Sequence, residues 1–190
     1  LHTPFPKSFD SPKARGQAFH FFANHELLAI ELMALTLLRF PEAPKRFKKG
    51  LLHIIKEEQE HLGLYIEGAK HLGVSIGDLP VNRFFWDMLS ECSSPYSFIV
   101  GMGLTFEQAN LDHALRFMKL FNQAGDHESA AIVQRVYEDE IRHVKHALHW
   151  FHQWKNPKNN DWDNHLQSLQ YPLTPARAKG LVFSSEARKR

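Results

Sequence analysis

Two stretches of the chain have the form Glu-x-x-His, a spacing that can bind a metal ion. They are Glu58–His61 and Glu140–His143. Because positions i and i+3 lie on the same face of a helix, the carboxylate and the imidazole of each stretch can reach one cation. Each motif alone is a weak signal, since 13 glutamates and 13 histidines give about one such pairing by chance. The position of the motifs relative to other acidic residues is more informative.

In the first half of the chain, a further glutamate lies level with the first motif. Glu26 is 15 residues before Pro41. Glu58 is 14 residues after Pro44, so the two glutamates of an antiparallel helical pair should be level to within ~1.5 Å, the rise of one residue. This half of the chain therefore offers one glutamate opposite one Glu-x-x-His motif.

The second half of the chain repeats this arrangement. Glu107 lies 18 residues before Gly125, and Glu140 lies 15 residues after it, an offset that is small once the turn is subtracted. An acidic residue also precedes each motif, in Glu57-Glu58 and in Asp139-Glu140. Glu57 could substitute for its neighbour as a ligand, but the parallel with the second motif favours Glu58. The repeated pattern predicts two similar hairpins packed about a pseudo-twofold axis.

Four carboxylates and two imidazoles suit two divalent cations, because four negative charges offset four positive charges. The six candidate ligands are Glu26, Glu58, His61, Glu107, Glu140 and His143. Apolar residues flank the glutamates at helical spacing, which predicts that these side chains are buried rather than solvated. Without metal, the convergence of four buried carboxylates would be costly, and some of them would hold protons.

Neighbouring residues leave alternatives open. Glu31 is a rival to Glu26, but it lies five residues closer to the turn and would be about 7.5 Å off the level of Glu58. Glu31 and Asp112 can instead orient ligands or form ordinary buried ion pairs. Three further residues could lie beside the metals or simply in the core, namely Tyr65, Tyr137 and His146.

The elements that must position these residues are helices. Apolar residues recur at three-and-four spacing, and no segment has the period of a strand. The predicted long helices cover about 12–40, 44–72, 95–122 and 127–154, with short helices near 82–91 and 162–169. A short turn, a long connection and a second short turn are typical of a ferritin-like bundle. We therefore predict an all-α, ferritin-like four-helix bundle of two antiparallel hairpins with a long crossover, followed by a short C-terminal helix and tail.

Length and composition favour one globular domain over 1–190, with the bundle at about 12–154 and an extension over 155–190. The formal net charge of +2 is too small to indicate a nucleic acid or an anionic membrane as a partner. The single cysteine, Cys92, cannot form an internal disulfide, so we expect a cytoplasmic protein. No apolar run reaches the roughly 20 residues that span a bilayer, and we expect no membrane partner.

The chain resembles a ferritin-like family, domain of unknown function 455, over most of residues 16–190. The stretches that carry the likeness are Glu26-Leu-Leu-Ala-Ile-Glu31, Glu57-Glu58-Gln-Glu-His61, Phe106-Glu107, Asp139-Glu140-Ile-Arg-His143-Val144 and Ser185-Glu-Ala-Arg-Lys189. The resemblance implies that the six candidate ligands bind the metal. One departure is Asn24, where a histidine is expected, and it affects a contact of the first helix rather than the ligands.

These observations lead to the hypothesis of a dinuclear metal protein with two iron ions, or manganese in their place. One expectation is an oxygen-dependent oxidase or hydroxylase whose partners are dioxygen or peroxide and a small-molecule substrate. The alternative is metal handling or peroxide removal of the ferritin, rubrerythrin or manganese-catalase type. A third reading is a structural module with a vestigial site. The sequence identifies no catalytic residue and leaves the substrate, the metal and a homodimer open.

Overall fold

The computed structural model describes residues 5–189, which form helices and no strand, so the all-α prediction is confirmed. The predicted boundaries at residues 1 and 190 lie outside the described residues. Three helices are long, namely α1 (Pro12–Arg39), α2 (Lys45–His71) and α6 (His127–Trp154). A fourth long stretch consists of α4 (Pro95–Gly101), the π-helix η1 (Met102–Glu107) and α5 (Gln108–Gln123). The short helices are α3 (Phe84–Leu89), α7 (Asp161–Ser168) and α8 (Pro175–Ala178).

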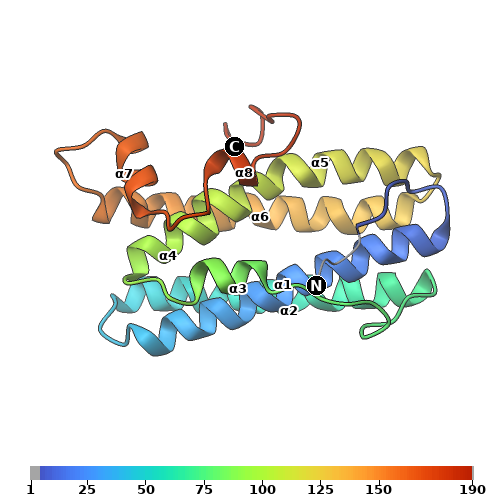
Figure 1. The fold of residues 1–190 in the computed structure, drawn as a ribbon, viewed down its shortest axis with the longest axis horizontal. Coiled ribbons are helices and arrows are strands. Elements are labelled where there is room, and N and C mark those ends of the chain that lie inside the picture. Colours follow the sequence, from blue (N-terminus) through green and yellow to red (C-terminus); the bar gives the residue numbers. More distant parts are fainter. Residues whose placement is uncertain (1–4, 190) are drawn as a thin grey trace.

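The long helices are arranged as two hairpins that lie side by side (Figure 1). Helix α1 packs along α2, α5 packs along α6, and α2 also contacts α6. Each hairpin closes through a short turn, whereas the connection that carries α3 runs from one hairpin to the other. This is the predicted order of a short turn, a long connection and a short turn.

The helix ends follow local sequence signals. Ser11 begins α1 by accepting a hydrogen bond from the backbone N–H of Ala14 at 3.2 Å, and a proline follows in the first turn. Ser94 and Ser97 form a reciprocal capping box at the start of α4. Gly125 ends the second hairpin's first helix with a φ of 75°, a left-handed conformation that favours glycine.

The fourth long stretch is not the continuous α-helix that its periodicity predicts. Residues Met102–Glu107 are wound as a π-helix, and all six are buried. Gly103 allows this segment to approach α6, because an added Cβ would lie 2.3 Å from the Cβ of Ala147. A π-helical turn changes the register of the residues around it, and such turns are frequent at functional sites. Here the last residue of the turn is Glu107.

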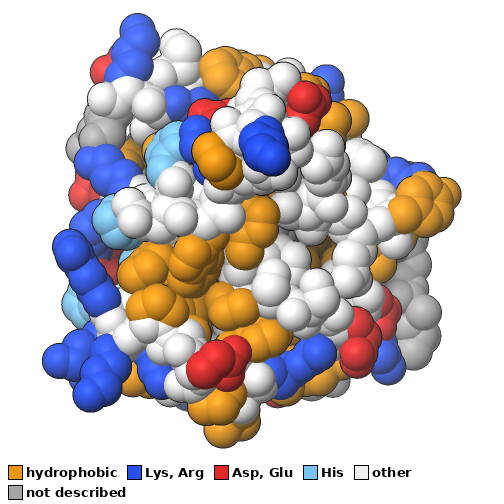
Figure 2. Space-filling model, turned by 90° about the vertical axis from the view of Figure 1, so that its left-hand side faces the viewer, with side chains coloured by type: hydrophobic (Ala, Val, Ile, Leu, Met, Phe, Trp, Pro, Cys, Tyr) orange, Lys and Arg blue, Asp and Glu red, His pale blue; other side chains and the backbone are white. Residues whose placement is uncertain are grey.

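Two apolar clusters form the core at opposite ends of the hairpins. One contains Phe47, Phe98 and Trp150, and the other contains Phe19 and Phe121. Along α1 and α2, the candidate ligands fall between the residues of these two clusters, and on α6 they lie where one cluster ends and the other follows. The polar centre therefore lies inside an otherwise apolar interior. Hydrophobic side chains also gather on the surface, at the centre of the face nearest the α1–α2 turn (Figure 2).

Helix α1 is more apolar than we expected. By length and composition alone, this helix of 28 residues could cross a membrane. This finding corrects the expectation that no apolar run is long enough. Half of its most apolar stretch is buried inside the protein, and the buried residues of α1 include Asn24 and Glu26. Much of the apolar character of α1 is thus used in packing against the rest of the chain.

The C-terminal tail is fastened to α5 through Asp112, which is buried. Both carboxylate oxygens of Asp112 bind Arg188, with N–O distances of 2.9 and 3.0 Å, and the backbone N–H of Ser184 donates to Oδ1 at 2.6 Å. Gly180 lets the tail lie close to the helix, since an added Cβ would lie 2.7 Å from the Cβ of Asp112. Asp112 therefore belongs to an ion pair with the tail and does not orient a candidate ligand.

Replacing Asp112 with Asn should release the tail, because the amide keeps the size of the side chain but loses the charge that Arg188 binds. We expect the free energy of unfolding to fall by about 2 kcal/mol in urea titrations. Amide hydrogen exchange of residues 180–189 should become faster. Asp87→Asn is the control, because its pair with Arg83 is largely exposed and should change stability by about 0.5 kcal/mol or less. Equal stability of Asp112→Asn and wild type would contradict this account.

Candidate metal centre

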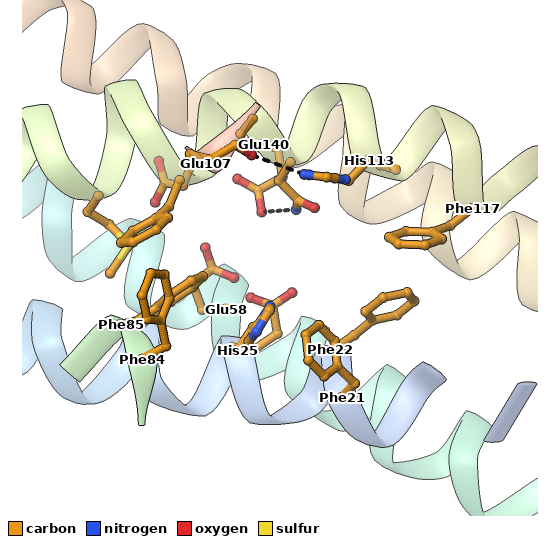
Figure 3. A pocket seen from close by; sticks show the side chains of 18 of the residues that line it. Phe21, Phe22, His25, Glu58, Phe84, Phe85, Glu107, His113, Phe117 and Glu140 are labelled. Carbon is orange, nitrogen blue, oxygen red and sulfur yellow. Dashed lines mark hydrogen bonds between the residues drawn. The ribbon is translucent and has the colours of Figure 1, made fainter. Parts of the chain in front are cut away.

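The six candidate ligands come from the four long helical stretches, and none is more than 8% exposed. They are Glu26 on α1, Glu58 and His61 on α2, Glu107 on η1, and Glu140 and His143 on α6. Figure 3 shows the carboxylates of Glu58, Glu107 and Glu140 directed toward a common space between the hairpins. All six side chains therefore lie in one region of the interior.

The possible ligand atoms gather in two overlapping groups. Within each group the atoms all lie within 4.8 Å of one another. One group contains Glu26, Glu58 and His61, and the other contains Glu58, Glu107, Glu140 and His143. Glu58 belongs to both groups. This arrangement is what two neighbouring cations that share a carboxylate would require.

Both histidines turn the same ring nitrogen toward the centre. The Nδ1 atom of His61 lies 2.9 Å from Oε2 of Glu58. The Nδ1 atom of His143 lies 3.0 Å from Oε1 of Glu58 and 3.5 Å from Oε2 of Glu140. The Nδ1 atoms are therefore the nitrogens available to a cation at this centre.

The other ring nitrogens are held by acids of the opposite hairpin. The Nε2 atom of His61 bonds Oδ2 of Asp139, and Nε2 of His143 bonds Oε2 of Glu57, both at 2.9 Å. Arg142 binds Glu57 at 2.6 Å and also contacts Asp139. Such contacts fix the orientation of each imidazole with Nε2–H donating to the acid, so Nδ1 can bind a metal ion once its own proton is released.

This crossed pairing was not predicted. From the sequence alone, Glu57 is expected only as a substitute for Glu58, and Asp139 only as part of the repeat. The available signal was the acidic residue that directly precedes each Glu-x-x-His motif. The histidine that each of these acids bonds could not be identified from the sequence, because Glu57 and His143, for example, are 86 positions apart.

Burial controls the protonation of the centre. Burial and repulsion by Glu58 raise the pKa of Glu26 well above its ordinary value, and burial and repulsion by Glu140 do the same to Glu107. Burial opposes the charged form of Glu58 as well, but the imidazoles of His143 and His61 outweigh it and hold the pKa of Glu58 below its usual range. Without a cation, the centre thus relies on protons and imidazole charge to balance its carboxylates.

The residues of this centre fit divalent cations in two further respects. Oε2 of Glu140 and Nδ1 of His143 are buried, and neither makes a well-oriented hydrogen bond within residues 5–189. A buried polar atom without a partner is costly, and a cation would satisfy both atoms. The remaining oxygen of Glu140 accepts a hydrogen bond from the Asn110 amide at 3.0 Å, which fixes the carboxylate.

A cavity of about 520 Å³ opens beside the acidic centre. Its lining includes the four candidate glutamates, Tyr65, and several phenylalanines from α1, α3, η1 and α5 (Figure 3). The cavity lies between the two hairpins and reaches Arg177 of α8 in the C-terminal extension. The centre is therefore accessible to a small molecule from one side.

Three residues that the sequence leaves as alternatives, and Asn24, lie outside the groups of ligand atoms. Glu31, the rival of Glu26, is exposed. Tyr137 is buried within an apolar cluster, and the ring of His146 stacks on Phe47 outside the two groups of ligand atoms. Asn24 donates a hydrogen bond to the backbone oxygen of residue 82 at 3.1 Å and so ties α1 to the long connection.

Replacing Glu26 or Glu107 with Gln should stabilise the metal-free protein at pH 8. In the folded protein their raised pKa keeps these carboxyls protonated, whereas in the unfolded chain they ionise above their ordinary value of 4.5. The stability that they contribute is full below pH 4.5 and is lost as the pH rises toward the folded pKa. Since glutamine does not ionise, we expect a gain of about 1–3 kcal/mol at pH 8 and a smaller gain at pH 5.

The measurement is urea unfolding in a chelating buffer at both pH values. Glu31→Gln is the matched control, because this glutamate lies on the same helix as Glu26 but is exposed. A loss of stability at pH 8 in both buried variants, or a gain that does not depend on pH, would contradict the assignment of raised pKa values.

Comparison with known proteins gives one match. The family described as "Protein of unknown function (DUF455)" matches residues 2–190, which is nearly the whole chain. No curated protein and no solved structure matches the chain. This chain belongs to the DUF455 family.

Proposed function

We propose that this chain is a ferritin-like protein that binds two iron ions and oxidises or hydroxylates a small organic molecule with dioxygen. Manganese is the alternative metal. The observation that carries the proposal is the burial of four carboxylates and two imidazoles in two overlapping groups between the hairpins. A ligand set of one glutamate on each of two helices and a Glu-x-x-His motif on each of the other two is characteristic of ferritin-like di-iron proteins.

Each group would hold one ion. Glu26 and His61 belong to one group, and Glu107 and His143 belong to the other. Glu58 is common to both groups and is the candidate to contact both ions. When bound, two adjacent redox-active ions supply electrons for the reduction of dioxygen.

The protein's own residues provide the surroundings that such chemistry needs. The apolar clusters on both sides shield the centre from bulk solvent except where the cavity opens, and this shielding strengthens electrostatic interactions inside it. Asp139 and Glu57 hold the two histidines with Nδ1 facing inward. Asn110 holds Glu140 in place. These contacts are formed without metal, so the centre is organised before an ion arrives.

The cavity favours substrate oxidation over metal storage or peroxide removal. Ferrous ions, dioxygen and hydrogen peroxide are small and need no cavity of about 520 Å³ with aromatic walls. Cavities of roughly 300–1,000 Å³ are typical of sites for organic ligands. The position of this cavity directly beside the four glutamates places a bound molecule next to the proposed ions.

Glu58→Ala and Glu140→Ala should each lower the amount of bound metal sharply, because each removes a carboxylate from a group of ligand atoms. Helix content should stay largely unchanged, since the helices are held by the apolar clusters. The measurement is metal analysis after loading with Fe(II) under argon, together with circular dichroism. Glu31→Ala is the control and should bind as much metal as wild type. Unchanged metal stoichiometry in both buried variants would refute the ligand assignment.

The test of function is oxygen uptake after Fe(II) loading. Mixing the loaded protein with aerated buffer should consume dioxygen faster than the same amount of free Fe(II), because the centre holds two ions together. Glu140→Ala should behave like free Fe(II). A protein that consumes no oxygen with iron, but decomposes hydrogen peroxide when loaded with manganese, would overturn the oxidase proposal in favour of peroxide removal.

A further inference from the structure

The cavity beside the acidic centre has aromatic walls. Phe22 and Phe106 are buried, while Phe84 is 44% exposed, so the walls extend from the interior to the surface. Six phenylalanines line the cavity, namely Phe21, Phe22, Phe84, Phe85, Phe106 and Phe117. Flat aromatic surfaces of this kind favour a flat apolar ligand, which can stack on them or meet their edges.

Two histidines, His25 and His113, line the cavity among the phenylalanines (Figure 3). His25 is the better placed of the two to bond a ligand. Its ring stacks on Phe85, with 4.6 Å between centroids, and meets the edge of Phe21 at 4.2 Å. Its ring lines the cavity, and no hydrogen bond within residues 5–189 engages either of its nitrogens, so they can bond a polar group of a ligand.

His113 lies on the α5 side of the cavity and connects α5 to the C-terminal extension. Its Nε2–H donates to the backbone oxygen of Ala178 at 3.1 Å. Ala178 and Arg177 both line the cavity, so α8 forms part of its wall. His113 is therefore fixed by the tail, whereas His25 keeps its hydrogen-bonding capacity for a ligand.

The charges around the cavity favour a neutral ligand. An anion would meet the four glutamates at the inner end, and a cation would compete with the proposed metal ions there. Arg177, at the outer end, is the cationic residue among those that line the cavity, and its guanidinium already donates to the backbone oxygen of Pro172 at 3.1 Å. A ligand that is apolar except for one polar group would match this cavity, because His25 is the one lining histidine whose imidazole has no hydrogen-bond partner within residues 5–189.

We propose that this cavity binds a neutral aromatic compound with one hydrogen-bonding group, and that His25 bonds that group while the phenylalanines contact the ring. This inference deepens the proposed function, because it names the class of molecule that the centre would oxidise. The binding itself depends on the cavity alone and can be measured without metal.

The experiment uses 2-naphthol and naphthalene as probes, which differ by one hydroxyl group. Isothermal titration of wild type, without metal and after Fe(II) loading under argon, should give one site per chain with tighter binding of 2-naphthol. In His25→Phe, the affinity for 2-naphthol should fall about fivefold to tenfold, because one hydrogen bond is lost. The affinity for naphthalene should change less than about twofold. His152→Phe, on an exposed histidine, is the matched control and should leave both affinities unchanged.

A second variant tests whether the probes enter this cavity at all. Ala114 is buried on α5 and lines the cavity, so Ala114→Phe should fill it and weaken both probes more than tenfold. Ala29→Phe fills it from α1 and replaces the first variant if that one does not fold. Thermal unfolding checks that each variant is folded.

Three results would overturn the inference: no binding of either probe by wild type, tighter binding of the anion 2-naphthoate than of 2-naphthol, or equal weakening of both probes by His25→Phe. A different result would refute the proposed function and leave this inference intact: wild type would bind 2-naphthol but take up no Fe(II). Conversely, a protein that takes up Fe(II) and consumes oxygen without binding 2-naphthol would leave the proposed function intact and refute this inference.

Discussion

The constraint on which this structure depends is the burial of four carboxylates in one region of a small helical protein. Negative charge is strongly destabilised away from water, so each of these groups needs a proton, a cation or a hydrogen-bond donor. The histidines supply part of the compensation through their contacts with Glu58. The raised pKa values of Glu26 and Glu107 supply another part, since these carboxyls hold protons. Two divalent ions would replace both forms of compensation, and this supports our proposal that the centre binds metal.

The same groups also connect the two hairpins. His61 on α2 bonds Asp139 on α6, and His143 on α6 bonds Glu57 on α2, so each histidine is held by the opposite hairpin. Arg142 contacts both of these acids from the outside. The two histidines themselves are at most 1% exposed, and this burial between the apolar clusters strengthens the hydrogen bonds that they form. Binding and stability therefore oppose each other at this centre, because a glutamate that would bind metal also destabilises the metal-free fold.

Much of the fold could be predicted because its signals are local. The spacing of apolar residues defines the long helices, and residues such as Ser11, Ser94 and Gly125 mark their ends. The level of Glu26 relative to Glu58 follows from helix geometry and the position of one turn. The π-helix at Met102–Glu107 could not be predicted, because its register depends on how this segment packs against α6. The contacts of Asp112 with the tail and of Glu57 with His143 were also out of reach, since they join residues more than 70 positions apart.

The most direct test of the account is anomalous diffraction at the iron edge from crystals grown with Fe(II) under argon. We expect two peaks between the hairpins, one bounded by Glu26, Glu58 and His61 and the other by Glu107, Glu140 and His143, with Nδ1 of each histidine facing its peak. Crystals with no iron peak among these side chains, or with iron only at the surface of the protein, would contradict it.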